Sequence, residues 1–518
     1  MERFLQLYQS DIVGVLEGFD RLLFRGIQRS ICFPGGLEKF LVNQGVWLKN
    51  FGPFATRLTK RIRKHAEQMA KRLGRPFRYV ASAGHDKDQI VRDILEKCPV
   101  KEGLIAVLSC LEPCTAFDVR LNGHWLELYL RPRKCLHLYF YYLDREFGLM
   151  HVRLQTWLPF PIQVCINGRE YLARQLTREG IGFEQRDNSF SRIDNLPRAQ
   201  QLLDRLQTRS WVGVLNRFAR AVMPWLRRRR MPAPHGTSDR LRPYYWTARQ
   251  SEYASDIMFR DAARLRETYP QLVRHALQHF VSGDVLRFLG RRGNSPFHGE
   301  ATTDYKARPE GVRIKHRVNE NSIKMYDKHG CILRIETTIN QPNRFRVRRL
   351  MTRGKQRRWT WMPLRKGVVD LPRRTDLSRA ANHRYLEALA GVQLSAPVHR
   401  LLDPVSRSIV RAGRPYRGLR PVMPEEARLY AALLDGRFTL QGFRNQDIRQ
   451  VLMPQGAADV KTRRRLSGQA SRWLRLLRAH GLIRKVGSQR YYRLTPNGIA
   501  VMSTAQKLRE TDTQKLAA

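Results

Sequence analysis

Apolar residues near the C-terminus recur at helical spacing and then alternate with polar residues. Within residues 466–502, the helical pattern ends at Gly481, and alternation follows over 483–486 and 491–494. Thr495-Pro496 then supplies an N-cap oxygen and a proline at the first position of a new helix. This stretch therefore predicts a helix, a β-hairpin and a closing helix.

The N-terminal part of the chain mixes short apolar runs with longer amphipathic stretches. Residues 13–19 and 21–24 read as a pair of strands, 37–70 as largely helical, and 103–108 as a buried strand. Strand, helix and strand in this order predict an α/β domain with a mixed sheet over residues 1–230.

A Pro/Gly-rich basic run at residues 227–240 predicts a domain boundary. Beyond it we expect helices, the first over 256–268, and then a β-meander over 312–339. These elements predict a central α+β domain at residues 240–400. No internal repeat is evident in the sequence.

The C-terminal helix, basic hairpin and helix resemble the winged helix-turn-helix of MarR-like DNA-binding proteins. The resemblance covers residues 422–518 and implies that a recognition helix at about 467–480 lies in the DNA major groove. It implies DNA contacts from three residues of this helix and from two that flank the hairpin tip, namely Gln469, Arg472, Arg475, Lys485 and Arg490. Winged helices also serve as protein–protein modules. The expected fold class is therefore α/β (α+β) and multidomain.

The net charge of the chain indicates what kind of partner to expect. The 518 residues carry a net charge of +50, and 42% of them are hydrophobic, so the chain combines sizeable cores with a strongly basic surface. DNA is the expected partner, structured RNA is a second candidate, and a homo-oligomer is compatible with both. The seven cysteines show no paired CxxC spacing. With no secretory signal and no apolar run long enough for a bilayer, we expect a cytoplasmic, nucleoid-associated protein without a membrane partner.

Three carboxylates follow predicted strands: Asp20, Glu112 and Asp144. Acids at strand ends resemble the active sites of RNase H-like nucleases and transposases, and this resemblance implies Mg²⁺ or Mn²⁺ bound by all three residues as the catalytic and metal-binding set. The alternative is that acids follow strands because turns are polar, with Arg21 and Arg145 as their ion-pair partners.

A second candidate site is the segment NSIKMYDKHGCILRIETTIN at 321–340. Its K-x-Y-x-K…R-x-E pattern resembles a segment of rolling-circle replication initiators, in which a tyrosine attacks a DNA phosphate. By this resemblance Tyr326 is a nucleophile and Glu336 a metal ligand or base, and Lys324, Lys328 and Arg334 contact nucleic acid. The His-hydrophobe-His motif usual in those initiators is absent, and an ordinary exposed hairpin is the alternative.

The whole chain resembles an uncharacterised family of basic, often multi-copy bacterial proteins, through stretches such as GFDRLLFRG, FGLMHVRLQTWLPF and NSIKMYDK. The resemblance implies a protein of a mobile element or replication system. We expect an enzyme that cleaves or joins DNA strands, with a nuclease or transposase as the reaction class. The alternative is a non-enzymatic DNA-binding regulator or the protein component of an RNA–protein complex.

Overall fold

The computed structural model describes residues 1–227, 243–290, 299–308, 311–353, 356–391, 398–434, 442–452, 459–486 and 491–510. The chain forms two compact units. The first comprises Met1, Tyr8–Val273 and Val285–Leu386, and the second comprises Glu2–Leu7, Arg274–Asp284 and Glu387–Ala518. The fold is mixed α/β, as predicted.

An eleven-stranded sheet forms the first unit, in the order β10-β11-β12-β13-β9-β1-β6-β5-β4-β3-β2. Only β2 and β3 are parallel among its described pairs, so the predicted mixed sheet is confirmed. The strands are β1 (Ile12–Ile27), β2 (Phe77–Tyr79), β3 (Gly103–Asn122), β4 (Trp125–Asp144), β5 (Gly148–Gln155), β6 (Ile162–Asn167), β9 (Tyr245–Phe259), β10 (Ala301–Arg308), β11 (Gly311–Val318), β12 (Asn321–Lys328) and β13 (Ile332–Ile339).

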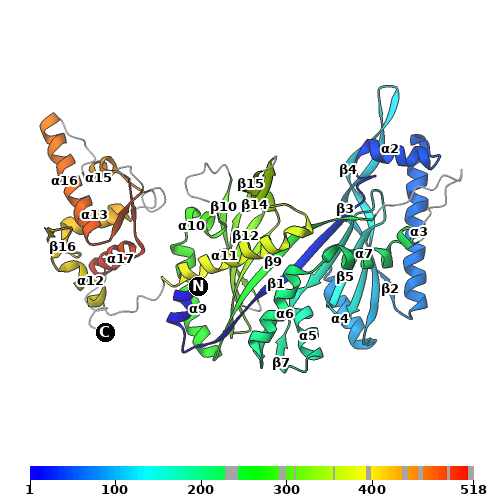
Figure 1. Ribbon diagram of the computed structural model, residues 1–518, viewed down its shortest axis with the longest axis horizontal. Coiled ribbons are helices and arrows are strands. Elements are labelled where there is room, and N and C mark those ends of the chain that lie inside the picture. The colour runs from blue at the N-terminus through cyan, green and yellow to red at the C-terminus, as the bar shows by residue number, and fades with distance from the viewer. Residues whose placement is uncertain are drawn as a thin grey trace. The chain divides into compact units, whose positions relative to one another are not determined.

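Two strands at the middle of the sheet differ from the sequence-based expectation. Residues 12–27 form one continuous strand, β1, with a bulge between Phe19 and Arg21, rather than two strands. The helix expected at 256–268 begins only at Ala262, because residues up to Phe259 belong to β9. β9 pairs with both β1 and β13, so the sheet is continuous across the boundary predicted near residue 230 (Figure 1).

Helices pack against both faces of this sheet. The main core joins Leu22 and Phe24 of β1 to apolar side chains of the helices after β1 and β6. On the opposite face, α4 packs Val91 against Ile105 of β3. The helices are α2 (Pro34–Asn43), α3 (Phe51–Arg72), α4 (Lys87–Lys97), α5 (Gly168–Arg178), α6 (Leu196–Thr208), α7 (Trp211–Val222), α8 (Pro224–Arg227), α9 (Ala262–Gln278), α10 (Ser282–Phe288) and α11 (Leu371–Leu389).

The strand order repeats on either side of the β1/β9 pair. Read outward, one half runs β1-β6-β5-β4-β3 and the other β9-β13-β12-β11-β10. In each half a helical segment follows the first strand, and a four-stranded meander returns to pair its last strand with the first. β6 consists of IQVCIN at 162–167, and the last residues of β13 with the residue after it read IETTIN at 335–340. The sequence alone did not reveal this structural repeat.

The second unit is mainly helical and has its own apolar core. The helix, hairpin and helix predicted near the C-terminus are present as α16 (Val460–Ala479), β18 (Ile483–Lys485), β19 (Tyr492–Leu494) and α17 (Pro496–Glu510). Other elements here are α1 (Glu2–Leu7), α12 (Val398–Ser406), α13 (Pro424–Leu433), α15 (Asn445–Leu452), β16 (Ile409–Arg411) and β17 (Arg414–Tyr416). Among the helices described, none is long and apolar enough to cross a membrane.

Two small hairpins complete the first unit: β7 (Phe183–Arg186) with β8 (Ser189–Ile193), and β14 (Arg346–Arg353) with β15 (Gln356–Pro363).

Candidate functional site

Three carboxylates converge at the centre of the large sheet. Asp20, Glu252 and Glu336 come from the adjacent strands β1, β9 and β13, and each offers an oxygen within 4.8 Å of the others. Neighbouring strands lie about 4.8 Å apart, so side chains on one face of adjacent strands meet at this spacing. All three are buried. This cluster can hold a metal ion, and carboxylate oxygens are the ligands that Mg²⁺ and Mn²⁺ prefer.

The bulge in β1 places Asp20 in the cluster. Phe19 pairs with Tyr253 and Arg21 with Glu252, so Asp20 is the extra residue between two ladder pairs. A bulge of this kind re-aims a side chain locally. The carboxylate then accepts hydrogen bonds from the Asn188 amide at 2.9 and 3.1 Å and pairs with Arg334 at 3.3 Å.

A cavity of about 480 Å³ opens above the cluster. Besides the three carboxylates, its lining includes five basic side chains, three further acids and two tyrosines, namely Arg21, Arg92, Arg313, Lys324, Lys328, Asp88, Glu170, Asp327, Tyr141 and Tyr326. The three clustered carboxylates can bind a metal ion, and the basic side chains among the other lining residues can bind an anion beside it.

Each carboxylate of the cluster has a cationic partner. Lys324 Nζ lies 2.6 Å from Glu336 and 3.8 Å from Glu252, and Arg21 lies 2.9 Å from Glu252. Burial and the nearby Glu336 charge raise the pKa of Glu252. Burial opposes ionisation of Glu336 as well, but Lys324 and two hydrogen bonds lower its pKa to about 2. Of these two glutamates, Glu252 therefore holds its proton more strongly.

Beneath the cluster, a fully buried arginine pair surrounds Asp256 of β9. Arg334 donates to its two oxygens at 2.5 and 2.8 Å, and Arg169 of α5 donates at 2.7 Å. Arg334 also donates to the Asn188 carbonyl at 2.6 Å. Asp256 thus fixes Arg334, which in turn fixes Asp20 and Asn188.

Tyr326 and Glu336 form the pair that the K-x-Y-x-K…R-x-E pattern implied. The Tyr326 hydroxyl donates to Glu336 Oε2 at 2.6 Å, and β12 and β13 form the expected hairpin. Burial and the Glu336 charge raise the pKa of Tyr326 well above its usual value, so the hydroxyl is protonated at neutral pH. Glu336 is the base within reach of that proton.

The structure does not bring Glu112 or Asp144 to Asp20. Neither lines the cavity or belongs to the cluster among the described residues. Glu112 lies within β3 rather than at its end, and it is held by the Tyr139 hydroxyl at 2.7 Å, Arg153 at 2.6 Å and Lys87 at 3.1 Å.

Asp144 has a different structural role at the end of β4. It accepts the backbone N–H groups of Glu146 and Phe147 at 2.9 and 3.0 Å, and Arg217 lies 3.4 Å away. This is the polar-turn arrangement that was the alternative to a metal site.

The residues expected to contact nucleic acid fall into three groups. Lys324 and Lys328 line the cavity, whereas Arg334 is fully buried and faces Asp256 instead of solvent. Four of the predicted residues are exposed, three on α16 and one on β18, namely Gln469, Arg472, Arg475 and Lys485. Arg490 lies outside the described residues.

Four residues of the site were not predicted: Glu252, Asp256, Arg169 and Asn188. The first two lie on β9, which has alternating buried positions only in its first half and is buried throughout its second half. A strand covered on both faces lacks the period-two signal. Glu252 and Asp256 are four residues apart, and this spacing places both side chains on one face of a strand. It is the sequence signal that could have identified them.

No family model, curated protein or solved structure matches this chain.

Proposed function

We propose that the protein binds nucleic acid and cleaves or joins its phosphodiester bonds at the Asp20/Glu252/Glu336 cluster, with Mg²⁺ or Mn²⁺ as cofactor. The observation that carries the proposal is the convergence of three buried carboxylates at the floor of a cavity rimmed by lysine and arginine. When bound, the metal ion supplies charge stabilisation at a phosphoryl oxygen and lowers the pKa of water.

The residues around the cluster have distinct proposed roles. Arg21, Lys324 and Lys328 offset the charge of the phosphate and position it. Asn188 and Arg334 hold Asp20 in place. Glu336 accepts a proton from the attacking group, which is either water or the Tyr326 hydroxyl.

With Tyr326 as nucleophile, its oxygen forms a bond to phosphorus while the bond from phosphorus to the leaving sugar oxygen breaks. The phenol proton passes to Glu336, and the departing oxygen takes a proton from solvent. Water as nucleophile gives hydrolysis with no covalent intermediate. The two routes differ in whether a protein–DNA adduct forms.

For DNA docking we propose α16 as a recognition helix within a winged helix-turn-helix. Gln469, Arg472 and Arg475 are exposed on it, and Lys485 is exposed on the following hairpin. This arrangement agrees with the geometry in which a second helix enters the major groove. It also suits the net charge of +50.

The test is cleavage of labelled single- and double-stranded DNA with Mg²⁺ or Mn²⁺. We expect wild type to be active, Glu252→Gln and Glu336→Gln to be inactive, and Glu112→Gln to retain activity, because Glu112 lies outside the cluster. A covalent adduct that forms with wild type and not with Tyr326→Phe indicates the tyrosine route, whereas cleavage by both proteins without an adduct indicates the water route. Equal activity in Glu252→Gln and Glu112→Gln would exclude this centre.

A second candidate function is nucleic-acid binding without catalysis, by a DNA-binding regulator or the protein part of an RNA–protein complex. It is favoured by the ion pairs that Asp20, Glu252 and Glu336 already make with Arg334, Arg21 and Lys324. In that case no metal-dependent cleavage occurs with any substrate, and binding is the same in EDTA and in Mg²⁺. Sequencing nucleic acid that co-purifies with the protein distinguishes a discrete RNA partner from DNA.

A further inference from the structure

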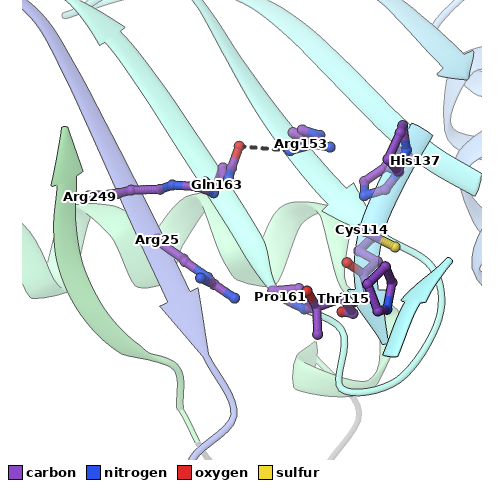
Figure 2. A pocket seen from close by; sticks show the side chains of 11 residues that line it. Arg25, Cys114, Thr115, His137, Arg153, Pro161, Gln163 and Arg249 are labelled. Carbon is purple, nitrogen blue, oxygen red and sulfur yellow. Dashed lines mark hydrogen bonds between the residues drawn. The ribbon is translucent and has the colours of Figure 1, made fainter. Parts of the chain in front are cut away.

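A second cavity, of about 390 Å³, opens on the same sheet and is lined by three arginines. Figure 2 shows Arg25, Arg153 and Arg249 on three different strands, with Gln163 and His137 beside them. A hydrogen bond of 3.1 Å from Arg153 to Gln163 fixes one guanidinium. The strands are β1, β5 and β9, so the cavity adjoins the middle of the sheet.

Positive charge in this cavity is only partly balanced. Arg153 pairs with Glu112 at 2.6 Å, but neither Arg25 nor Arg249 forms an ion pair within the part of the chain that the structure describes. Burial and the charges of Arg249 and Arg153 lower the pKa of Arg25. Burial and Arg153 also lower the pKa of His137 to about 4, so it adds no charge at neutral pH. An anion would relieve this repulsion.

The arginine cavity is the structural counterpart of the acidic one in the repeated strand order. Arg153 pairs with Gln163 across β5 and β6, as Lys324 pairs with Glu336 across β12 and β13. Two residues further along β5 and β12, Gln155 and Tyr326 line the two cavities.

Each of the two cavities also contains a residue from a β-bulge. Asp20 is the bulged residue of β1, and Arg249 is the bulged residue of β9, between the pairs Leu23–Gln250 and Phe24–Ala248. The same backbone device thus places an acid in one cavity and an arginine in the other.

We propose that this arginine cavity binds a phosphate group, and that the phosphate belongs to the same nucleic-acid strand that reaches the acidic cluster. The identity of the strand rests on the proposed function, whereas the phosphate site rests on Arg25, Arg153 and Arg249 alone. Arg21 lines the acidic cavity and Arg25 the arginine cavity, both on one face of β1. Four residues along a strand span roughly 13 Å. One strand of nucleic acid can therefore contact both cavities.

The test measures binding in EDTA, so that catalysis plays no part. Affinity for a fluorescent single-stranded oligonucleotide is measured against salt for wild type, Arg25→Ala and Arg249→Ala, with Arg178→Ala as the matched control. Arg178 is exposed on α5 and lines neither cavity. We expect both cavity variants to bind several-fold more weakly and to lose roughly 0.7 from the slope of log K against log salt, as for one phosphate contact to a single strand. Arg178→Ala should resemble wild type.

Thermal melting in inorganic phosphate tests whether the arginine cavity binds free phosphate as well as a phosphate of nucleic acid. We expect inorganic phosphate to raise the melting temperature of wild type and of Arg178→Ala, and to raise that of Arg249→Ala less. Because Arg249 makes no ion pair with any residue that the structure describes, Arg249→Ala should melt in phosphate-free buffer at the same temperature as wild type or higher. Such a result shows that the variant folds. Normal oligonucleotide binding by both cavity variants together with an Arg249-dependent phosphate effect would overturn the nucleic-acid assignment. Absence of both effects would overturn the phosphate site itself.

These outcomes are independent of the cleavage assay. Loss of cleavage in Glu252→Gln, together with oligonucleotide binding that depends on Arg25 and Arg249, supports both sites. Oligonucleotide binding that depends on Arg25 and Arg249, with no metal-dependent cleavage by wild type, retains the phosphate site and removes the proposed enzyme.

Discussion

At the scale of single residues, the acidic centre is a balanced set of opposite charges. Asp20, Glu252, Glu336 and Asp256 face Arg21, Lys324, Arg334 and Arg169. A divalent ion added to this set leaves an excess of positive charge, which an anionic phosphate offsets. Metal and substrate binding should therefore favour each other.

Glu252→Gln should affect stability and metal binding in opposite directions. The raised pKa of Glu252 means that ionising it costs folding free energy as pH rises through that pKa, so the neutral glutamine should leave the apo protein at least as stable at pH 7.5. Loss of an anionic ligand should weaken Mn²⁺ binding by at least about tenfold, the loss typical even of outer-sphere changes. Thermal unfolding with and without Mn²⁺ measures both. A destabilised apo variant with normal Mn²⁺ affinity would contradict the assignment.

The same carboxyl group should make metal binding pH-dependent. Since Mn²⁺ must displace the proton of Glu252, affinity should rise with pH through a range above the ordinary glutamate value of 4.5. Titrations of Mn²⁺ between pH 5 and 8 test this, with Glu252→Gln as the reference that should lose most of the dependence. A flat profile in wild type would show that Glu252 does not bind the ion.

Asp256→Asn should be strongly destabilising, because it leaves Arg169 and Arg334 buried without their shared counter-ion. Removal of one partner from a buried pair costs about 3–5 kcal/mol. Burial opposes ionisation of Asp256, yet the two arginines lower its pKa, so its contribution is present at neutral pH and is lost only as pH falls below about 4. Urea unfolding at pH 7 measures the cost. Glu179→Gln, in a more exposed pair with Arg198, should change the free energy of unfolding far less.

Sequence patterns predicted some residues of the acidic cluster and its surroundings. The spacing of Lys324, Tyr326 and Glu336 identified side chains that do meet, because a short hairpin fixes its own register. Asp20 was also singled out, but its partners are far away in the sequence. Glu252 and Glu336 reach it through strand pairings that a single sequence does not reveal.

At the scale of elements, β9 is the strand on which both halves of the sheet depend. It pairs with β1 along one edge and with β13 along the other. Its second half is buried throughout, and its last residues run directly towards α9, which explains why residues 256–268 were expected to be helical. By contrast, the C-terminal hairpin and helices were predictable because caps and turns are local signals.

Asn382 of α11 ties this helix to β9 and β13. Its amide nitrogen lies 3.1–3.2 Å from the Tyr253 and Ile335 carbonyls and the Ser255 hydroxyl, and its oxygen accepts from Thr337 at 2.7 Å. Asn382→Ala leaves these buried groups unpaired and should lower the free energy of unfolding by about 2–3 kcal/mol. Chemical denaturation measures the loss.

The control for Asn382 is Asp376→Ala, at an exposed position of the same helix. It should change stability by less than about 0.5 kcal/mol. Equal effects from the two substitutions would mean that the amide does not hold α11 against the sheet.

At the scale of the whole molecule, the net charge of +50 is the main reason to expect a polyanionic partner. The structure contains two basic surfaces in different units: the cavity-bearing sheet face, and the exposed side of α16. Composition predicts that a polyanion binds. Which basic residues lie on the sheet face and which on α16 depends on strand pairing and helix packing, and composition does not predict it. The contribution of each surface to nucleic-acid binding can be measured separately.

The double substitution Arg472→Ala/Arg475→Ala should weaken binding to double-stranded DNA and lower its salt slope by about 1.8, as for two phosphate contacts. The matched control is Arg414→Ala/Arg428→Ala, which removes two exposed arginines from the same unit. Fluorescence anisotropy at several salt concentrations measures both slopes. If the double variant and its control behave alike, α16 is not a DNA-binding helix.

Combining the α16 pair with Arg249→Ala tests whether the two surfaces bind one nucleic acid. Distant, independent contacts contribute additively, so the losses in binding free energy for a substrate with both duplex and single-stranded parts should sum to within about 0.5 kcal/mol. If instead each surface binds its own molecule, Arg249→Ala should have no effect on such a substrate once α16 is intact. Additive losses would mean that the duplex held by α16 is continuous with the strand that reaches the acidic cluster, and this continuity is what a site-directed cleavage or joining enzyme requires.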